Sequence, residues 1–380
     1  MAITSPHPRT PSAPTAPRWS STLRSGVRRV AELAATPLVP ADYLDIIDPL
    51  RPGADLRGRV EGVFPETADA ATILIKPGAD WAGHVPGQYV RIGIDVDGVR
   101  QWRAYSLTHG PRDDGRIAVT VKAVPDGKVS HHLVRNTRVG TMVHLEQAAG
   151  EFVLPEEGGK FLFVTAGSGV TPVIGMLRNL FPVTEEGVVR LPRSDAFDIT
   201  VVHVAPSHPD SIFARNLAEL HEAGMIRLVA RYDDEHGVLD VADLAELVPD
   251  LDARVTYACG PAGLLGALEA HHTDRGLELQ TEQFRMATLV TGEGGSVSFT
   301  GSGITVEATG DRPILDHAEE AGVLMPSGCR MGVCFGCVLP LREGIVRDLR
   351  SGDITTAQEG DGVKIQTCIS AAAGPCRIDH

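Results

Sequence analysis

The sequence predicts a multidomain chain in which an antiparallel β-barrel is followed by an α/β domain with a parallel sheet and then by a compact α+β domain. Its length of 380 residues exceeds what one hydrophobic core usually serves, so two or three domains are expected. The spacing of apolar residues also changes twice along the chain, as described below. In addition, three of the six cysteines are crowded onto one glycine-rich loop, which indicates a separate small unit built around that loop.

The composition is that of an ordinary globular protein with an acidic balance. Charged residues make up 22% of the chain and the formal net charge is −14, which argues against nucleic acid as a partner. The clustered cysteines do not resemble the disulfide framework of a secreted protein. No stretch approaches the roughly 18 consecutive apolar residues that a membrane-spanning helix needs. We therefore expect a cytoplasmic protein.

The first 54 residues are expected to precede the barrel. Residues 1–20 are rich in Pro, Ser and Thr and contain no acidic residue, which is typical of a disordered tail. Residues 21–54 are expected to form a helical extension, whose first part places Leu and Val at helical spacing beside Arg24, Arg28 and Arg29. This basic amphipathic helix either packs on the following domain or contacts a membrane surface or a partner.

Residues 55–155 have the pattern of the barrel. Short runs with alternating apolar residues, such as "ATILIKP" and "RIAVTVKAV", are separated by turns rich in Gly, Asp and Pro. Many short strands at this spacing, with little helical periodicity between them, predict an antiparallel barrel.

The remaining chain is expected to form two more domains. In residues 156–284, apolar runs such as "FLFVTA" and "DITVVHV" alternate with helical stretches, which predicts a parallel sheet with crossover helices. A linker over 285–294 follows. In residues 295–380, a hairpin around "TGSG" and the helical stretch "PILDHAEEAGV" precede the cysteine loop, which predicts a compact α+β domain.

The cysteine loop has the spacing of an iron-sulfur ligand set. Cys329, Cys334 and Cys337 give C-x4-C-x2-C, and Cys368 follows as the fourth cysteine, which is the plant-type pattern for a [2Fe-2S] cluster. Two irons need four thiolates, and glycines in the loop let the backbone approach the cluster. Zinc is the alternative, but zinc sites usually show two C-x2-C pairs or a mixture of Cys and His. Residues 295–380 resemble a β-grasp plant-type ferredoxin domain.

Three motifs in the expected barrel indicate a flavin site. "PGQYV", "RAYSL" and "GKVSHHL" follow one another in that order. An Arg for a phosphate, a Tyr for a ring face and a Ser near a redox nitrogen form a minimal flavin clamp. Together the motifs resemble the flavin-binding domain of the ferredoxin-NADP reductase superfamily. The resemblance implies that Arg103 holds the flavin phosphate, Tyr105 lies against the isoalloxazine and Ser106 lies near its N5 edge.

The same resemblance implies that the flavin is FAD. It assigns Gly127, Val129 and Ser130 to backbone and hydroxyl donors for a pyrophosphate at a helix start. Relatives that use FMN tend to carry additional arginines around a terminal phosphate, and no such cluster follows Ser106. We therefore expect FAD rather than FMN.

A glycine turn in the α/β domain predicts a site for a nicotinamide nucleotide. "GSGVTP" follows the run "FLFVTA", and such a turn between strand and helix brings backbone N–H groups to a pyrophosphate. The turn does not match G-x-G-x-x-G, but it resembles the GxGxxP turn of the same superfamily. The resemblance assigns Gly167 and Gly169 to the turn and Thr171 to positioning the nicotinamide.

A second turn, "YACGP", ends a later strand and resembles the CGP turn of the superfamily. The resemblance assigns Cys259, Gly260 and Pro261 to the nicotinamide site, with Cys259 near C4, where it helps orient the ring for hydride transfer to the flavin. A nucleophilic cysteine and a plain buried thiol are the alternatives. The expected catalytic residues are Tyr105, Ser106, Thr171 and Cys259.

The choice between NADPH and NADH depends on few residues. Enzymes that prefer NADH usually place an acid near the end of the second strand, where this chain has Ser207 and His208 before Asp210. Arg231 aligns with a superfamily position that often meets a 2'-phosphate. We expect NADPH, with NADH as the alternative.

The resemblance over residues 55–380 implies an electron-transfer reductase. Hydride brings two electrons to the flavin, which passes them singly to the cluster and on to an external acceptor. The layout resembles reductases of the phthalate dioxygenase type, and the N-terminal extension resembles that of actinobacterial reductases serving membrane-bound stearoyl-CoA desaturases. The implied acceptor is a di-iron desaturase of lipid metabolism, with peripheral membrane contact through the N-terminal helix. A ring-hydroxylating or other oxygenase is the alternative acceptor, and a redox-sensing binding module is a third hypothesis.

Overall fold

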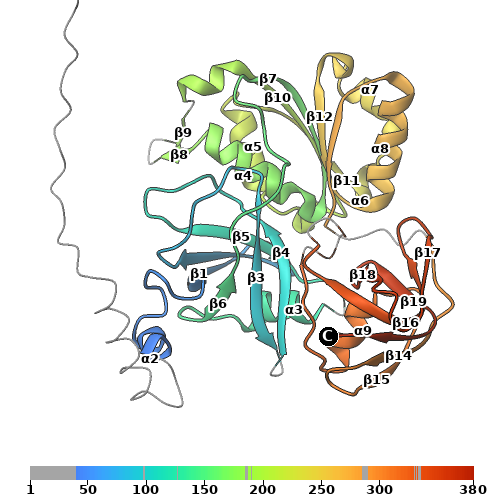
Figure 1. The fold of residues 1–380 in the computed structure, drawn as a ribbon. Helices are drawn as coiled ribbons and strands as arrows, with labels where there is room; N and C mark the ends of the chain where they lie inside the picture. Colours follow the sequence, from blue (N-terminus) through green and yellow to red (C-terminus); the bar gives the residue numbers. More distant parts are fainter. Residues whose placement is uncertain are drawn as a thin grey trace, which may run out of the picture.

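Figure 1 shows the computed structural model, in which three large sheets follow one another along the chain. The expected tail over 1–20 and the basic helix with Arg24, Arg28 and Arg29 lie outside the described residues. The structure describes residues 40–96, 99–125, 127–184, 187–189, 191–284, 290–328, 330, 332 and 335–380.

The first domain is an antiparallel β-barrel, as predicted. Its strand order is β4-β3-β6-β1-β2-β5, and all neighbouring strands are antiparallel. An isolated antiparallel bridge between Leu107 and Val119 joins the end of β4 to β5 and closes the sheet. The elements are α2 (Pro40–Ile47), β1 (Arg57–Pro65), β2 (Ala70–Pro77), β3 (Tyr89–Val96), β4 (Val99–Ser106), β5 (Ile117–Lys122), α3 (Lys128–His131) and β6 (Met142–Leu145).

Alternation of side chains along these strands builds the core of the barrel. Ile73, Ile75 and Val119 are fully buried in it. On β3, Gly93 leaves room for the ring of Trp102 on the neighbouring strand, because a Cβ at this glycine would lie 2.9 Å from the indole. The close approach fixes the Trp102 ring against β3.

The second domain is the predicted parallel sheet, in the order β11-β10-β7-β12-β13. Helices α4 and α5 pack with one face of the sheet and α7 and α8 with the other, so the strands are buried on both sides. The elements are β7 (Gly159–Ala166), α4 (Val170–Leu180), β10 (Phe197–Ala205), α5 (Ala214–Glu222), β11 (Arg227–Tyr232), α6 (Asp233–His236), α7 (Leu244–Leu247), β12 (Val255–Cys259), α8 (Ala262–Arg275) and β13 (Leu279–Glu282), with a small hairpin of β8 (Val183–Thr184) and β9 (Gly187–Val188).

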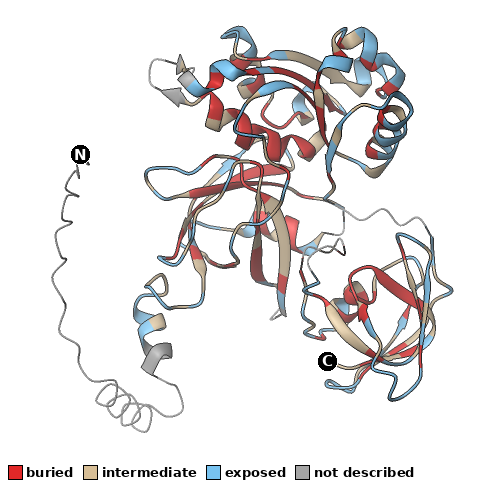
Figure 2. Ribbon diagram, turned by 45° about the horizontal axis from the view of Figure 1, so that its top comes forward, coloured by how far each residue is buried: buried red, intermediate tan, exposed pale blue. Residues whose placement is uncertain are grey.

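The third domain is a mixed sheet with one helix, in agreement with the predicted α+β class. Its strand order is β15-β14-β19-β16-β17, with β18 paired to β16, and β14 is parallel to β19. Figure 2 shows that buried residues gather inside each of the three sheet domains. The elements are β14 (Gly295–Phe299), β15 (Thr305–Ala308), α9 (Ile314–Glu320), β16 (Val338–Asp348), β17 (Ile354–Ala357), β18 (Lys364–Gln366) and β19 (Ser370–Ile378).

Within the described part of the chain, no helix combines the length and the apolar character that crossing a membrane would require.

Candidate functional site

The main cavity lies where the three domains meet. It has a volume of about 520 Å³, within the usual range for a small-molecule site. Strands β4 and β5 and the segment around α3 line it from the barrel. Ser168 and Thr171 line it from the α/β domain, and α9, Arg330 and Cys368 line it from the third domain. One cavity therefore borders the expected flavin motif, the first nicotinamide turn and a predicted cluster ligand.

The "RAYSL" motif on β4 places its three predicted residues on this cavity. The Ser106 hydroxyl is buried and has no hydrogen-bond partner among the described residues. An unpaired buried hydroxyl is costly, so this atom fits a ligand that supplies the missing partner. Loss of solvent around the phenol raises the pKa of Tyr105, so its ring is neutral at physiological pH. A flat neutral ring and an unpaired hydroxyl suit the face and edge of an isoalloxazine.

Arg103 is the cationic end of the same motif. Its Nη1 donates a hydrogen bond of 2.8 Å to the carbonyl of Trp102, and its Nη2 lies 3.8 Å from a carboxylate oxygen of Glu319. Burial lowers the pKa of Arg103, and the nearby charge of Arg330 lowers it further. The Arg103 guanidinium at the edge of the cavity fits a phosphate, whose negative charge would offset both effects.

The turn before α3 also lines the cavity. Gly127 is required for its close packing, because a Cβ would lie 2.4 Å from the Ser130 hydroxyl. That hydroxyl donates to the Gly127 carbonyl (2.9 Å) and accepts from the backbone N–H of Val124 (3.2 Å). The Ser130 side chain thus stabilises the turn itself. Val129 is buried beneath it, so this segment presents mainly backbone groups to a cofactor.

The two glycine turns of the α/β domain contact each other. A Cβ at Gly169 would lie 2.0 Å from the Cys259 carbonyl oxygen, so only glycine permits this approach. The Thr171 hydroxyl donates 2.9 Å to the Ser168 carbonyl, and both residues reach the cavity. Gly167 and Gly260 flank this contact in the chain. The carboxyl ends of β7 and β12 are therefore joined at the cavity, where a parallel sheet binds nucleotides.

Cys259 is fully buried at the end of β12, and Gly260 and Pro261 follow it in the turn. Burial raises the pKa of the thiol well above its usual range. A buried neutral thiol is a poor nucleophile, so the environment of Cys259 does not favour covalent catalysis.

Sequence reasoning missed two residues at and just after the end of β13. Glu282 ends β13 in register with Cys259, and one of its carboxylate oxygens is buried without a partner among the described residues. Burial raises its pKa to about 8. Phe284 follows and lines the cavity with a half-exposed ring. Both residues lie in "TEQF", a short polar stretch that ends in an aromatic residue after the last apolar run. This stretch is the sequence feature that could have pointed to them.

Arg231 lies at the end of β11, two strands away from β7, and does not line the cavity. Its Nη2 donates 3.2 Å to the carbonyl of His236. Neighbouring strands are about 4.8 Å apart, so Arg231 is roughly 10 Å from the glycine turn across the sheet edge. That separation fits opposite ends of a dinucleotide bound along the carboxyl ends of the strands.

The structure brings two of the four predicted cluster ligands together. The sulfurs of Cys337 and Cys368 are buried and 3.1 Å apart, while Cys329 and Cys334 lie outside the described residues. The hydrogen bond with Cys368 lowers the pKa of Cys337 to about 6, which favours the thiolate that binds iron. Gln366, two residues before Cys368, donates a hydrogen bond of 2.9 Å to the Gly332 carbonyl. These residues fit a [2Fe-2S] cluster, and Cys368 places it beside the cavity.

Comparison with family models identifies two of the domains. Residues 73–154 match an oxidoreductase FAD-binding domain, and residues 297–373 match a 2Fe-2S iron-sulfur cluster binding domain. A curated "NADPH oxidoreductase" of Mycobacterium tuberculosis is 42% identical over 93% of this chain and 92% of its own length. The reductase subunit of glycine betaine monooxygenase from Chromohalobacter salexigens is 26% identical over 74% of this chain and 84% of its own.

Solved structures support the domain arrangement. Phthalate dioxygenase reductase matches 86% of this chain and 98% of its own with a TM-score of 0.57 at 22% identity, which shows a shared fold. An intact type IV self-sufficient cytochrome P450 monooxygenase matches 88% of this chain with a TM-score of 0.55 at 22% identity, but only 44% of its own length is covered. The fold, the two cofactor domains and the near full-length relative agree. The chain belongs to the ferredoxin-NADP reductase superfamily and is an oxidoreductase that combines an FAD-binding domain with a C-terminal [2Fe-2S] ferredoxin domain.

Proposed function

We propose that the protein takes electron pairs from NADPH and delivers them one at a time to an iron-dependent oxygenase. The observation that carries this proposal is the shared cavity, which Tyr105, Thr171 and Cys368 line from three different domains. FAD accepts an electron pair as hydride and releases electrons singly to a [2Fe-2S] centre. A single cavity bordered by all three domains provides a short route for both transfers.

The residues around the cavity have separate roles in this proposal. Arg103 binds the flavin phosphate, Tyr105 packs on the ring, and the unpaired hydroxyl of Ser106 bonds the ring edge. Thr171 and the contact between Gly169 and Cys259 hold the nicotinamide against the flavin, which supplies the orientation that hydride transfer requires.

The remaining residues of the proposed cofactor sites act through backbone groups and thiolates. The turns that meet the pyrophosphates contain Gly127, Val129, Ser130, Gly167, Gly260 and Pro261. The cluster ligands are Cys329, Cys334, Cys337 and Cys368.

NADPH is the proposed donor because Arg231 lies where a 2'-phosphate would reach it at the end of β11. The name of the M. tuberculosis relative, "NADPH oxidoreductase", is consistent with this choice. NADH is the alternative donor, and the kinetic comparison described in the Discussion distinguishes the two.

Electrons are proposed to leave through the exposed side of the cluster loop. Phe335 lies in this loop between Cys334 and Cys337 and is 67% exposed, in a left-handed conformation with φ of 56°. An exposed aromatic ring next to a redox centre fits a docking contact for a protein acceptor.

The proposed acceptor is an oxygenase because two of the named relatives are reductase components of monooxygenases. One is the ferredoxin reductase component of 3-ketosteroid-9-alpha-monooxygenase from Mycolicibacterium smegmatis, which is 25% identical over 76% of this chain. Within this class we propose a membrane-bound di-iron stearoyl-CoA desaturase, on the resemblance of the N-terminal extension, and this partner would bring the protein to a membrane surface. A ring-hydroxylating oxygenase is the alternative.

The acceptor is tested by adding each purified candidate oxygenase to the holoprotein with NADPH and measuring the product. Oxidised product with the desaturase alone supports the proposal, and product only with a ring hydroxylase supports the alternative. A Cys337→Ser protein is the matched control, because it keeps the flavin site. Slow cytochrome c reduction by NADPH would favour the redox-sensing hypothesis instead.

A further inference from the structure

Two arginines cross the interface between the barrel and the ferredoxin domain in opposite directions. Arg91 of β3 donates from Nη2 to the carbonyl of Ser327, just before the cluster loop. Arg330, inside the loop, donates from Nε to the carbonyl of Trp102 on β4, at 3.3 Å. Each domain thus contributes a charged donor to a backbone acceptor of the other.

Arg91 is fixed by its own domain before it reaches the interface. Its Nη1 lies 2.6 Å from a carboxylate oxygen of Glu146, and its guanidinium lies 5.4 Å from the centre of the Trp102 ring. The ion pair and the cation–π contact hold the Arg91 side chain in one orientation. Little further side-chain entropy is therefore lost when the ferredoxin domain docks and the Ser327 carbonyl accepts its hydrogen bond.

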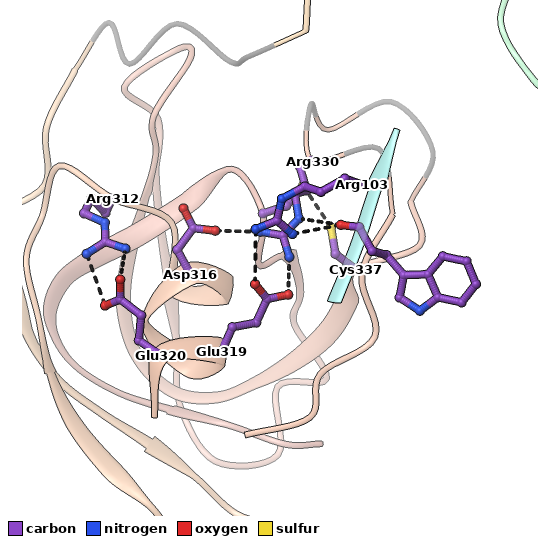
Figure 3. A network of polar contacts seen from close by, with 9 residues as sticks. Arg103, Arg312, Asp316, Glu319, Glu320, Arg330 and Cys337 are labelled. Atoms are coloured by element: carbon purple, nitrogen blue, oxygen red, sulfur yellow. Dashed lines mark hydrogen bonds and ion pairs between the residues drawn. The ribbon is translucent and has the colours of Figure 1, made fainter. Parts of the chain in front are cut away.

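Arg330 is fixed by carboxylates of α9. Its Nη1 donates 2.7 Å to Asp316 and its Nη2 donates to Glu319, as Figure 3 shows. The backbone of Arg330 is left-handed, with φ of 62°, a conformation that non-glycine residues rarely adopt. Tertiary contacts must maintain such a conformation, and here they direct the guanidinium toward β4.

A third contact connects this interface to the flavin site. Glu319, whose side chain is 9% exposed, binds Arg330 and also lies 3.8 Å from Arg103. Arg103 is the residue proposed to bind the flavin phosphate. The contacts of Arg330 therefore lie at the edge of the flavin cavity, which Arg103, Glu319 and Arg330 all line.

We propose that Arg330 and Arg91 are positioning residues for electron transfer from the flavin to the cluster. They hold the ferredoxin domain in the docked arrangement in which Cys368 borders the flavin cavity. The inference rests on the electron route proposed above. In this step one electron leaves the reduced flavin and the same electron reduces the oxidised cluster, so no other oxidant or reductant takes part.

The test uses full-length holoprotein in anaerobic stopped-flow reduction by NADPH, with flavin and cluster absorbance followed separately. Arg91→Gln should leave the flavin phase unchanged and slow the cluster phase roughly tenfold, and Arg330→Gln should slow the cluster phase to a similar extent, because each removes one charge-assisted hydrogen bond between the two domains. Arg330→Lys keeps the charge but places it on a single nitrogen, so it should recover part of the rate. Arg342→Gln is the matched control, because Arg342 pairs with Asp379 inside the ferredoxin domain.

Hydrogen–deuterium exchange provides a readout that does not depend on turnover. Backbone amides of β4 and α9 should exchange faster in Arg330→Gln and Arg91→Gln than in wild type, and Arg342→Gln should match wild type at both. Electron paramagnetic resonance of the reduced cluster and the sulfide content show whether each variant retains its cluster. If Arg330→Gln loses the cluster, Arg91→Gln decides the question, because Arg91 lies in the barrel.

Wild-type cluster-phase rates together with wild-type exchange at β4 and α9, in both glutamine variants, would overturn the proposal. If NADPH fails to reduce the flavin of the wild-type protein, the proposed function fails instead, and the exchange measurement still decides the docking role.

Discussion

Cys259 and Glu282 occupy paired positions on neighbouring strands at the carboxyl end of the parallel sheet. The thiol is fully buried, and the carboxyl group is 9% exposed with one oxygen unpaired among the described residues. Two neutral polar groups thus lie in register at the place where the nicotinamide is proposed to bind. Their protonation states follow from burial, and this makes the effect of pH predictable.

Replacing Glu282 by Gln should reduce the dependence of stability on pH. Burial raises the pKa of this carboxyl from 4.5 to about 8, so the folded protein keeps it neutral over a range in which the unfolded chain ionises it. The contribution of this carboxyl to the free energy of unfolding is complete below pH 4.5. It is lost as the pH rises from 4.5 through about 8, by up to about 1.4 kcal/mol per pH unit. Urea midpoints at several pH values in this range should fall more steeply for wild type than for the variant, and parallel profiles would contradict the prediction.

Changing Tyr105 to Ala should weaken flavin binding. The loss of a flat ring that packs on the isoalloxazine is expected to raise the dissociation constant for FAD roughly ten- to a hundredfold. Tyr105→Phe keeps the ring and serves as the control that should retain the flavin. Fluorescence titration of each apoprotein with FAD measures the effect, and an alanine variant that purifies fully yellow would show that the flavin is placed wrongly.

Replacing Arg231 by Gln should reduce the preference for NADPH. A lost charge-assisted contact to a 2'-phosphate is expected to raise KM for NADPH by roughly tenfold or more, with little change for NADH. Steady-state reduction of ferricyanide with each nucleotide measures both constants. Equal increases for the two nucleotides would mean that Arg231 does not contact the 2'-phosphate.

Changing Cys337 to Ser should separate the two redox sites. The thiol pairs with Cys368 in the proposed ligand set, so the variant should lose the cluster and its transfer to acceptors that draw from it. Ferricyanide reduction by the flavin should continue, because the barrel has its own core. Loss of both activities in a folded variant would argue against independent flavin and cluster domains.

Local patterns were sufficient to predict the domain classes. Ile73 and Ile75 alternate into the barrel core as their spacing indicates, and the cysteine spacing matches the domain that the family model identifies. The glycine turns could be recognised in the sequence because the close approach of Gly169 to the end of β12 requires a glycine at this position. Each of these features appears in the sequence as a short motif or a regular spacing.

Features that depend on tertiary contact could not be predicted in this way. The unusual pKa of Glu282 comes from burial, which its sequence neighbours do not reveal. The hydrogen bond from Arg330 to Trp102 joins residues 228 positions apart, and Arg91 meets Ser327 across 236 positions. The hydroxyl of Ser130 bonds within its own turn, a contact that its sequence neighbours do not reveal.

The central claim is that NADPH reduces a flavin in the shared cavity and that a cluster held by the late cysteines then withdraws the electrons singly. Anaerobic mixing of the FAD- and cluster-loaded wild-type protein with NADPH, followed at flavin and cluster wavelengths, tests this claim most directly. We predict loss of oxidised flavin absorbance first and bleaching of the cluster second, within the same turnover. A fully reduced flavin beside a cluster that stays oxidised would contradict the account.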